Sequence, residues 1–525
     1  MDAVLTILSA PSGHRTVTCR CGETLYAALI QAGETVEAPC GGAGRCGKCA
    51  VRAEGALSPM TPEEQHLPPG WRLACRTRIL GDCTVQLPDA AGTMDVLTDA
   101  APAPIGAGQS GFGAAIDLGT TSVAVALFDR STGRCMGVRG APNCQRRWGA
   151  DVVSRIHACM EDPANVTRMA EEIRHQLRTM LAEAAKQAGI RPTELCAVTL
   201  AGNPTMCHLV AGLSPVPLGS LPFQPVSRFG DDFDAAFLAS PLGVSETAAI
   251  WILPSVSGFF GGDAVGAACA VGLGDAEQPT LLLDVGTNGE MALAAGGRII
   301  CCSAAAGPAF EGANITCGMA GMDGAVAHAS LSATGMLQLS VLGETSPRGI
   351  CGSGLIDLLA VMRKLDAVDE TGRLLPPEEA PEAALPYLRL HQGEPAFFVA
   401  EEVYLTAGDV RALQLAKAAV AAGIQTMLAE VGLTANDVAT LVVAGGFGNR
   451  IDPVTAAQIG LYPPELADKT TAAGNAALAG AAIALGGTAA QASIIQLRDQ
   501  MESLELSADP RFSEFYMENL SFDTL

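Results

Sequence analysis

The sequence predicts a multidomain protein in which a small β-rich α+β domain precedes a larger, duplicated α/β domain. Three observations support this prediction. Residues 1–87 contain short alternating apolar runs separated by turn residues, with one helical segment at "TLYAALIQAG". Residues 88–111 are rich in Ala, Pro, Gly and Asp and have no periodicity, which is typical of a linker. From Phe112 onward, buried-type strands such as "GAAIDLG" and "TLLLDVG" alternate with helical segments, which is the pattern of an α/β fold.

The larger domain repeats one strand–turn–strand pattern. "AIDLGTTSVAVAL" begins at Ala115 and "LLDVGTNGEMALA" begins at Leu282. Each runs from an apolar strand through Asp, Gly and Thr into a polar turn and then a second apolar strand. Two such patterns, about one lobe apart, indicate a duplicated architecture. The predicted lobes span residues 112–275 and 276–525.

Two helices of the larger domain are expected to be buried. "TAAGNAALAGAAIALGG" predicts a close-packed core helix, because it consists largely of Ala and Gly. A second helix has Thr406 and Asp409 at its start, where they can cap it. Its apolar stripe consists of Val410, Leu413, Val420, Ile424, Met427 and Leu428.

The composition excludes several classes of protein. Hydrophobic residues make up 49% of the 525 residues and charged residues 17%, so the chain can bury large cores in about two to four domains. The net charge of −23 repels phosphate backbones and anionic lipid, which argues against nucleic acid and membranes as partners. Despite 17 cysteines, the start "MDAVLTILSAPSGHRTV" lacks the basic and apolar regions of a signal peptide. We therefore expect reduced thiols and a cytoplasmic protein.

A cysteine set in the first domain predicts a metal centre. Five residues separate Cys40 from Cys46, two separate Cys46 from Cys49, and Cys75 follows after a long gap. Three thiolates on one tight loop and a fourth from a distant segment suit a [2Fe–2S] cluster, which four cysteines hold. A loop around sulfides needs positive φ angles and close backbone approach. The glycines that can provide these are Gly41, Gly42, Gly44 and Gly47.

The same loop, "CGGAGRCGKC", also matches three other site patterns. A P-loop is disfavoured because Cys49 stands where Ser or Thr must reach Mg²⁺, and neither a P-loop nor a dinucleotide site has its strand–turn–helix context here. Structural zinc usually takes two separated cysteine pairs. Cys19, Cys21 and Cys83 of the same domain are expected to be buried or spare thiols. Lys48 is expected to be a surface charge beside the cluster.

The paired Asp-x-Gly-Thr turns form the predicted phosphate site. In each, a strand ends in Asp, and the next residues offer backbone N–H groups and hydroxyls that suit the β- and γ-phosphates of a nucleotide. The carboxylates of Asp117 and Asp284 can order Mg²⁺ through water or orient an attacking water. A third turn, in "LVVAGGFGNR", again follows a buried strand. Its glycines, Gly445 and Gly446, would let a flat adenosine lie against the backbone.

These three motifs, in this order, resemble the phosphate-1, phosphate-2 and adenosine motifs of the actin-like (ASKHA, ribonuclease H-like) ATPases. Over nearly its whole length the chain resembles one branch of them, the reductive activators of corrinoid proteins, which carry an N-terminal [2Fe–2S] domain. Longer relatives have a further small domain where this chain has only the linker. The resemblance implies a β-grasp-like ferredoxin domain followed by a duplicated actin-like ATPase domain. It rests on "PCGGAGRCGKC", "LACRT", "GADVVSRI", "GNPTMCHL", "GPAFEGANI", "GICGSGLID", "LQLAKAAV" and "AGGFGNRID".

The resemblance also implies roles for individual residues. Asp117 and Asp284 are the implied catalytic residues, and Asp284 is the one expected to orient the hydrolytic water. The implied cluster ligands are Cys40, Cys46, Cys49 and Cys75. The implied nucleotide contacts are Gly119, Thr120 and Thr121 in phosphate-1, Gly286, Thr287 and Asn288 in phosphate-2, and Gly445, Gly446 and Phe447 at adenosine.

Several further residues carry two interpretations each. Gly352 and Ser353 are expected either to face the nucleotide or, through Ser353, to cap the helix "LIDLLAVM". Lys417 is expected to be solvated, with a nucleotide contact as the alternative. Glu311 and Asp263 are expected in the cleft, with turn chemistry as the alternative. Four cysteines of the second lobe are expected to be buried thiols, with binding of a cofactor as the alternative: Cys301, Cys302, Cys317 and Cys351.

The implied function is ATP-dependent reductive activation of a corrinoid protein, with one electron passing from the cluster to Co(II) to restore Co(I) in a methyltransferase system. The implied cofactors are a [2Fe–2S] cluster, ATP and Mg²⁺. The implied partners are the corrinoid protein, a low-potential electron donor (a ferredoxin or a reductase) and a second copy in a homodimer. An activator of 2-hydroxyacyl-CoA dehydratases would lack a separate ferredoxin domain, and a sugar kinase would have no use for a cluster. An ATP-switched redox sensor or scaffold remains an alternative.

Overall fold

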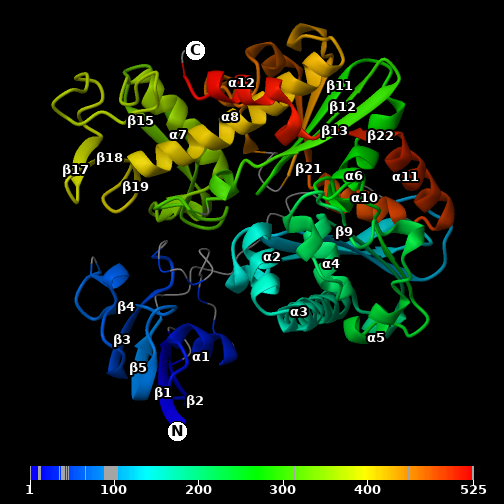
Figure 1. The fold of residues 1–525 in the computed structure, drawn as a ribbon, viewed down its shortest axis with the longest axis horizontal. Coiled ribbons are helices and arrows are strands. Elements are labelled where there is room, and N and C mark those ends of the chain that lie inside the picture. The colour runs from blue at the N-terminus through cyan, green and yellow to red at the C-terminus, as the bar shows by residue number, and fades with distance from the viewer. Residues whose placement is uncertain are drawn as a thin grey trace.

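The computed structural model describes residues 2–9, 13–32, 34, 36, 42, 44, 47–65, 67–87, 105–312, 314–445 and 450–522. Figure 1 shows a small N-terminal domain in blue beside a larger body. The small domain holds one five-stranded sheet, and the larger body holds a five-stranded and a six-stranded sheet with two small sheets beside them. The predicted order, an α+β domain followed by a duplicated α/β domain, is confirmed.

The N-terminal domain is a mixed sheet with one helix against it. Its strand order is β2-β1-β5-β3-β4, with β1 antiparallel to β2 and parallel to β5. The helix α1 (Leu25–Gln31) begins where the Thr24 hydroxyl accepts a hydrogen bond from the Ala27 N–H, and it buries Leu25 and Leu29. The strands are β1 (Asp2–Ser9), β2 (Gly13–Arg20), β3 (Ala50–Leu57), β4 (Trp71–Leu73) and β5 (Ile79–Gln86).

The first lobe has the strand order β10-β9-β6-β7-β8. The long helix α3 lays Ile173, Leu177 and Leu181 against the buried side chains of the sheet. The strands are β6 (Phe112–Leu118), β7 (Ser122–Asp129), β8 (Arg134–Pro142), β9 (Leu195–Gly202) and β10 (Ala249–Ile252). The helices are α2 (Val152–Glu161), α3 (Ala164–Ala188), α4 (Pro204–Ala211), α5 (Ala239–Leu242) and α6 (Gly262–Ala270).

The second lobe has the strand order β21-β20-β11-β12-β13-β22, with the small sheets β15-β14-β16 and β17-β18-β19 beside it. The main strands are β11 (Thr280–Val285), β12 (Gly289–Ala295), β13 (Arg298–Ala304), β20 (Thr440–Ala444), β21 (Thr470–Gly474) and β22 (Met501–Ser503). The small sheets comprise β14 (Ala325–Leu331), β15 (Leu337–Val341), β16 (Gly349–Ile350), β17 (Leu388–His391), β18 (Glu394–Phe398) and β19 (Tyr404–Thr406). The helices are α7 (Gly352–Lys364), α8 (Ala407–Glu430), α9 (Pro453–Gln458), α10 (Ala476–Ala484), α11 (Thr488–Gln500) and α12 (Pro510–Glu518).

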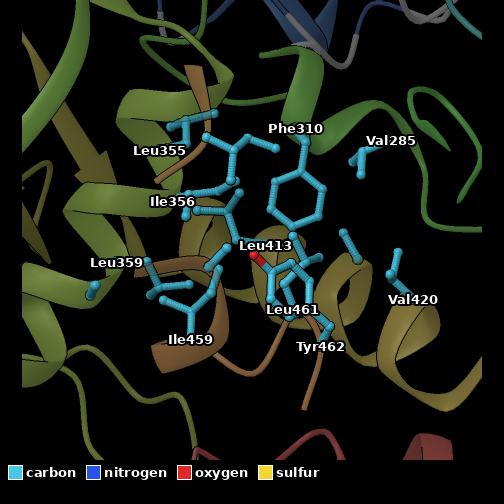
Figure 2. Close-up of a cluster of buried hydrophobic side chains, with 14 of the residues drawn as sticks. Val285, Phe310, Leu355, Ile356, Leu359, Leu413, Val420, Ile459, Leu461 and Tyr462 are labelled. Carbon is cyan, nitrogen blue, oxygen red and sulfur yellow. The ribbon is translucent and has the colours of Figure 1, made fainter. Parts of the chain in front are cut away.

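The core of the second lobe lies between its sheet and helices α7 and α8. Figure 2 shows Leu355 and Ile356 of α7 and Leu413 of α8 around the ring of Phe310. All four side chains are fully buried. This packing fixes the start of α7, which carries Gly352 and Ser353.

The two lobes repeat one topology. Each begins with an antiparallel hairpin, β6–β7 in the first lobe and β11–β12 in the second. Each then adds two parallel strands on the same side, β9 and β10 in the first lobe and β20 and β21 in the second. The duplication predicted from the paired turns is therefore confirmed, and the two turns hold equivalent positions in the two sheets.

Helix α10 packs against α6 of the first lobe and joins the lobes through a shared apolar core. The helices touch at glycines, because a Cβ on Gly480 would lie 2.2 Å from the Gly266 carbonyl oxygen. The predicted core helix in "TAAGNAALAGAAIALGG" is confirmed from Ala476 onward. Its first residues instead form the end of β21, because they pair with β20.

Helix α8 starts with the predicted cap. The Thr406 hydroxyl accepts a hydrogen bond from the Asp409 N–H, and the Asp409 carboxylate accepts one from the Thr406 N–H. Among the described helices, α8 alone is long and apolar enough to cross a membrane, but 78% of its most apolar window is buried inside the protein. Burial of this kind is typical of a core helix.

The prediction that Lys417 is solvated was wrong, and the alternative of a nucleotide contact is wrong as well. Lys417 is 1% exposed on α8 and donates a hydrogen bond to the Ser521 carbonyl oxygen at 2.7 Å. Its ammonium group lies 4.5 Å from the ring centre of Phe522. The Lys417 side chain holds the C-terminal segment against α8. It is therefore buried by residues that lie about a hundred positions away in the sequence.

Because of Lys417, the free energy of unfolding is expected to increase with pH in the alkaline range. Burial, followed by the charge of Arg363, lowers the pKa of Lys417 to about 8. Between that pKa and about 10.4 the unfolded chain binds a proton that the folded chain has lost, so the free energy of unfolding rises with pH. Each pKa unit is worth about 1.4 kcal/mol. Urea unfolding at pH 7.5 and at pH 10 measures this change. The increase in the free energy of unfolding between the two pH values should be smaller for Lys417→Met than for the wild type.

Lys469→Met is the matched control, because Lys469 also donates to backbone carbonyls but is only half-buried. The free energy of unfolding of this variant should increase between pH 7.5 and pH 10 as much as that of the wild type. An equal increase in the wild type and in Lys417→Met would contradict the prediction.

Candidate functional site

The two predicted phosphate turns face one cavity of about 210 Å³ between the lobes. Every predicted nucleotide or catalytic residue that the structure describes lines this cavity. They are Asp117, Gly119, Thr120, Thr121, Asp284, Gly286, Thr287, Asn288, Gly352, Ser353 and Gly445. Gly446 and Phe447 lie outside the described residues. Glu311 and Asp263 also line the cavity, as the cleft interpretation predicted.

The first turn, between β6 and β7, is tightly closed. A Cβ on Gly119 would lie 2.7 Å from the Ser122 carbonyl oxygen, so the turn requires glycine there. The Asn203 side-chain amide donates to the Thr120 hydroxyl at 2.8 Å. The carboxylate of Asp117, at the end of β6, accepts a hydrogen bond from the Asn475 amide at 2.8 Å. The first turn is thus held by two asparagines from different parts of the chain.

Glu311 connects the first turn to the second. Its Oε2 accepts hydrogen bonds from the Thr121 hydroxyl at 2.5 Å and from the Thr287 hydroxyl at 2.8 Å. The two hydroxyls lie 3.4 Å apart. The two turns therefore approach closely enough to bind one carboxylate, that of Glu311.

Five carboxylates stand among the described residues that line the cavity, and the only cationic side chain among those residues is Arg450. Burial raises the pKa of Asp117 to about 6 and that of Asp263 to about 7. Burial, together with the charges of Asp263, Asp117 and Glu311, raises the pKa of Asp284 to about 7. Glu290 and Glu311 also have raised pKa values, chiefly because they are buried. The described lining of the cavity is therefore rich in acidic groups, several of which raise one another's pKa values.

Ser353 lies in the first turn of α7 rather than at its N-cap, so the capping interpretation was wrong. The N-cap is Cys351. The Ser353 hydroxyl donates to the Ala327 carbonyl oxygen at 2.8 Å, which fixes α7 to β14. Backbone groups at the start of α7 therefore face the cavity.

Sequence reasoning missed Asn203 and Asn475 as site residues. Each follows the glycine that ends a strand and caps the next helix, Asn203 at α4 and Asn475 at α10. The recurring Ala-Gly-Asn pattern in "LAGNPT" and "AAGNAAL" was the available signal.

The cluster loop is described only in part, and Cys40 and Cys46 lie outside the described residues. The sulfurs of Cys49 and Cys75 lie 3.2 Å apart, farther than the roughly 2.05 Å of a disulfide. They meet because Cys49 precedes β3, Cys75 follows β4, and these strands are antiparallel. The described glycines of the loop have positive φ, as predicted: Gly42 (+84°), Gly44 (+77°) and Gly47 (+69°). Converging sulfurs on such a loop fit an iron–sulfur cluster.

Glu64 fixes the segment that carries Cys75, and sequence reasoning missed it. Its fully buried carboxylate accepts hydrogen bonds from the Arg72 guanidinium at 2.9 Å, the Leu73 N–H at 3.0 Å and the Thr77 hydroxyl at 2.9 Å. These contacts outweigh burial and lower the pKa of Glu64 to about 2. Glu64 is therefore ionised at neutral pH and holds both sides of the Cys75 turn.

Lys48, which is expected to be a surface charge beside the cluster, is half-buried and has specific partners. Its ammonium group donates to the Thr316 carbonyl oxygen at 3.0 Å and to the Gly318 carbonyl oxygen at 3.3 Å, both in the second lobe. Thr316 in turn donates to Asp409 at the start of α8. Met319 of the same segment lines the cavity. Lys48 thus joins the cluster loop to a segment that reaches the cavity.

The remaining cysteines occupy separate apolar surroundings. Cys301 and Cys302 are adjacent on β13, and their side chains enter two different buried clusters. Cys317 donates to a backbone carbonyl oxygen, and Cys351 lies in a third cluster. In the part of the chain that the structure describes, no three His, Cys, Asp or Glu side chains form a possible metal site.

Family models cover most of the chain. A model for the C-terminal domain of RACo, the ASKHA domain, matches residues 278–524, and a model for the RACo middle region matches residues 112–276. A model for the 2Fe-2S iron–sulfur cluster binding domain matches residues 10–80.

Individual proteins match as well. The chain is 32% identical over 430 residues to the corrinoid activation enzyme RamQ of Eubacterium limosum, which covers 78% of this chain and 70% of that protein. It is 27% identical over 270 residues to the [Co(II) methylated amine-specific corrinoid protein] reductase of Methanosarcina barkeri, which covers 47% of this chain and 46% of that protein. The solved structure of a reductive activator for corrinoid, iron–sulfur protein has a TM-score of 0.71 and 26% identity over 98% of both chains. Sequence and fold together show that the chain belongs to the RACo family of reductive activators of corrinoid proteins, with an N-terminal [2Fe–2S] cluster-binding domain and a C-terminal ASKHA domain.

Proposed function

We propose that this protein uses ATP to drive the one-electron reduction of a corrinoid protein from Co(II) to Co(I). The observation that carries the proposal is the presence, in one RACo-family chain, of a cluster-binding domain and a cavity between two duplicated Asp-x-Gly-Thr turns. RamQ is a corrinoid activation enzyme, and the Methanosarcina barkeri relative is a reductase of a Co(II) corrinoid protein. The corrinoid partner is thus inferred from the family.

The cavity has the chemistry that MgATP requires. Thr121 and Thr287 belong to opposite turns, and both hydroxyls donate to Glu311, so the two turns meet where a phosphate chain would lie between the lobes. Mg²⁺ takes carboxylate, water and phosphate oxygens as ligands. The raised pKa values of Asp117 and Asp284 mark carboxylates that a divalent cation would stabilise in their ionised form.

The two halves of the chain complement each other. When bound, the cluster supplies one electron at a time, and Cys40, Cys46, Cys49 and Cys75 are the residues that would hold it. For a one-electron couple, about 59 mV corresponds to a tenfold change in the equilibrium constant, or about 1.4 kcal/mol. ATP-driven closure of the lobes can therefore offset an unfavourable potential difference. The Lys48 contact places the cluster loop against the lobe that would close.

The proposal includes an electron donor, a location and an oligomeric state. The electron enters from a low-potential ferredoxin or reductase, and the protein works in the cytoplasm as a homodimer. The net charge of −23 favours a basic docking face on a partner protein.

One anaerobic assay tests the proposal. Reduced protein, MgATP and a Co(II) corrinoid protein of a methyltransferase system are mixed, and Co(I) formation is followed by absorbance. We expect Co(I) to form with ATP and not with ADP or without nucleotide. ATP-independent reduction, or no Co(I) with any corrinoid protein tried, would overturn the proposal. Steady ATP turnover stimulated by the corrinoid protein would exclude the redox-sensor alternative.

A further inference from the structure

The peptide carbonyl groups of the first turn are all bound from the side away from the cavity. The Asn143 side-chain amide donates to the Gly119 carbonyl oxygen at 2.7 Å, and the Asn143 N–H donates to that of Thr121 at 2.9 Å. Between them, the Arg155 guanidinium donates to the Thr120 carbonyl oxygen at 2.6 Å. Three consecutive carbonyls are thus fixed by two residues.

Fixing the carbonyls also fixes the N–H groups. In a trans peptide the C=O and the following N–H point in opposite directions. The N–H groups of Thr120 and Thr121 therefore point away from Asn143 and Arg155. Neither N–H donates a hydrogen bond within the described part of the chain. Both residues line the cavity, so two unengaged donors are available to an anion there.

We infer that Arg155 and Asn143 are positioning residues that hold the first turn in the conformation in which its N–H groups bind the phosphates of the nucleotide. The inference rests on the proposed function, because it assumes that a nucleotide occupies the cavity. Neither side chain lines the cavity itself. Both therefore act through the turn and do not touch the ligand.

Arg155 is suited to this role by its surroundings. It is fully buried on α2, and its other hydrogen bonds go to neutral acceptors: the Gly149 carbonyl oxygen, the Gln145 amide oxygen and the Met206 sulfur. In the described part of the chain no carboxylate forms a salt bridge with it. Burial lowers its pKa to about 10, so it remains charged at neutral pH. Its positive charge lies directly behind a turn whose other side faces acidic residues and, in our proposal, phosphates.

The segment before α2 explains how the arginine reaches the turn. Asp151 caps α2 by accepting a hydrogen bond from the Ser154 N–H at 2.7 Å. Gly149 has φ +144°, and a Cβ there would lie 2.2 Å from the Ser154 side chain. The Gly149 carbonyl oxygen accepts from Arg155. The motif "GADVVSRI" thus forms one structural unit. Its glycine allows the chain to bend before α2, its aspartate caps α2, and its arginine binds the carbonyl group of the first turn.

The second turn has a different construction. Its Gly286 N–H donates to the Asn288 carbonyl oxygen within the turn at 3.0 Å. Among the described residues, no side chain donates to the carbonyls of Gly286 or Thr287. The first turn is therefore the preorganised half of the site, and loss of Arg155 should affect phosphate binding strongly.

Nucleotide binding to the full-length protein tests the inference, with ATP and AMP as probes. Arg155→Met and Asn143→Asp should weaken ATP binding about tenfold or more, because each removes a charged or close hydrogen-bond donor from the turn. AMP binding should change less than twofold, since AMP has no β- or γ-phosphate for the turn. Arg155→Lys keeps the positive charge but lacks the planar guanidinium group, so its ATP affinity should lie between those of the wild type and Arg155→Met. In steady state, the loss should appear in KM for ATP more than in kcat.

The matched control is Arg174→Met, because Arg174 is a half-buried arginine of the same lobe that donates to the Val210 carbonyl oxygen at 2.8 Å. The Arg174→Met variant should bind ATP and AMP with the affinities of the wild type. If the Arg155 and Asn143 variants weaken ATP and AMP equally, their role is merely structural and the inference is wrong. If they bind ATP as the wild type does, it is wrong as well. A wild type that binds no ATP would instead overturn the proposed function.

Discussion

Replacing Asp284 by Asn is expected to lower kcat for ATP hydrolysis at least about 100-fold, with ATP binding retained. Asp284 is the last residue but one of β11 and faces the cavity, and no hydrogen bond within the described part of the chain engages its carboxylate. Asp117 differs, because Asn475 already holds its carboxylate. Asp284 is therefore the carboxylate available to orient an attacking water. Positioned proton acceptors of this kind contribute about 10²–10⁴ to the rate.

ATP affinity should change little in Asp284→Asn, because the substitution removes one of several crowded carboxylates and also one that would stabilise Mg²⁺. Single-turnover hydrolysis and equilibrium ATP binding separate the two effects. Asp275→Asn, an exposed aspartate just before β11, is the control and should behave as the wild type. Glu311→Gln tests the alternative that Glu311, and not Asp284, is the catalytic carboxylate. If Asp284→Asn turns over ATP normally and Glu311→Gln does not, the catalytic carboxylate is Glu311.

The cavity was predictable from sequence because its residues belong to turns that follow strands. Asp117 and Asp284 each stand one residue before the end of a strand, and Gly119 and Gly286 follow two residues later. Such local patterns survive folding, because the turn and its hairpin form from adjacent residues. The pairing of the two turns across one cavity followed from their repetition, since equivalent positions of duplicated lobes face each other.

Contacts between remote segments could not be predicted in the same way. Lys417 has the same local pattern whether its helix face meets water or the C-terminal segment. Lys48 meets Thr316 and Gly318 across the gap between two domains, and nothing in either local sequence indicates the other. Asn475 reaches Asp117 from the far end of the chain. In each case tertiary packing decides which partner a polar side chain meets.

Replacing Cys49 by Ala is expected to remove the cluster and all Co(I) formation while ATP turnover continues. Cys49 is 1% exposed, and its sulfur lies 3.2 Å from that of Cys75, so the variant loses a ligand at the point where two segments meet. The described residues that line the cavity belong to the two lobes of the larger body. Iron and sulfide content and the visible spectrum measure the cluster, ATP hydrolysis measures turnover, and absorbance measures Co(I), so the three consequences are followed separately.

Cys83→Ala is the matched control, because Cys83 is a 5% exposed thiol on β5 of the same domain. Burial and the nearby Cys19 raise the pKa of Cys83 to about 11, so it stays a neutral thiol at physiological pH, whereas iron binds the thiolate. Cys83→Ala should therefore keep wild-type iron and Co(I) formation. Wild-type iron content in Cys49→Ala would contradict the ligand assignment. Loss of ATP turnover together with the cluster would show instead that the cluster-binding domain, through contacts such as that of Lys48, is required for the cavity to work.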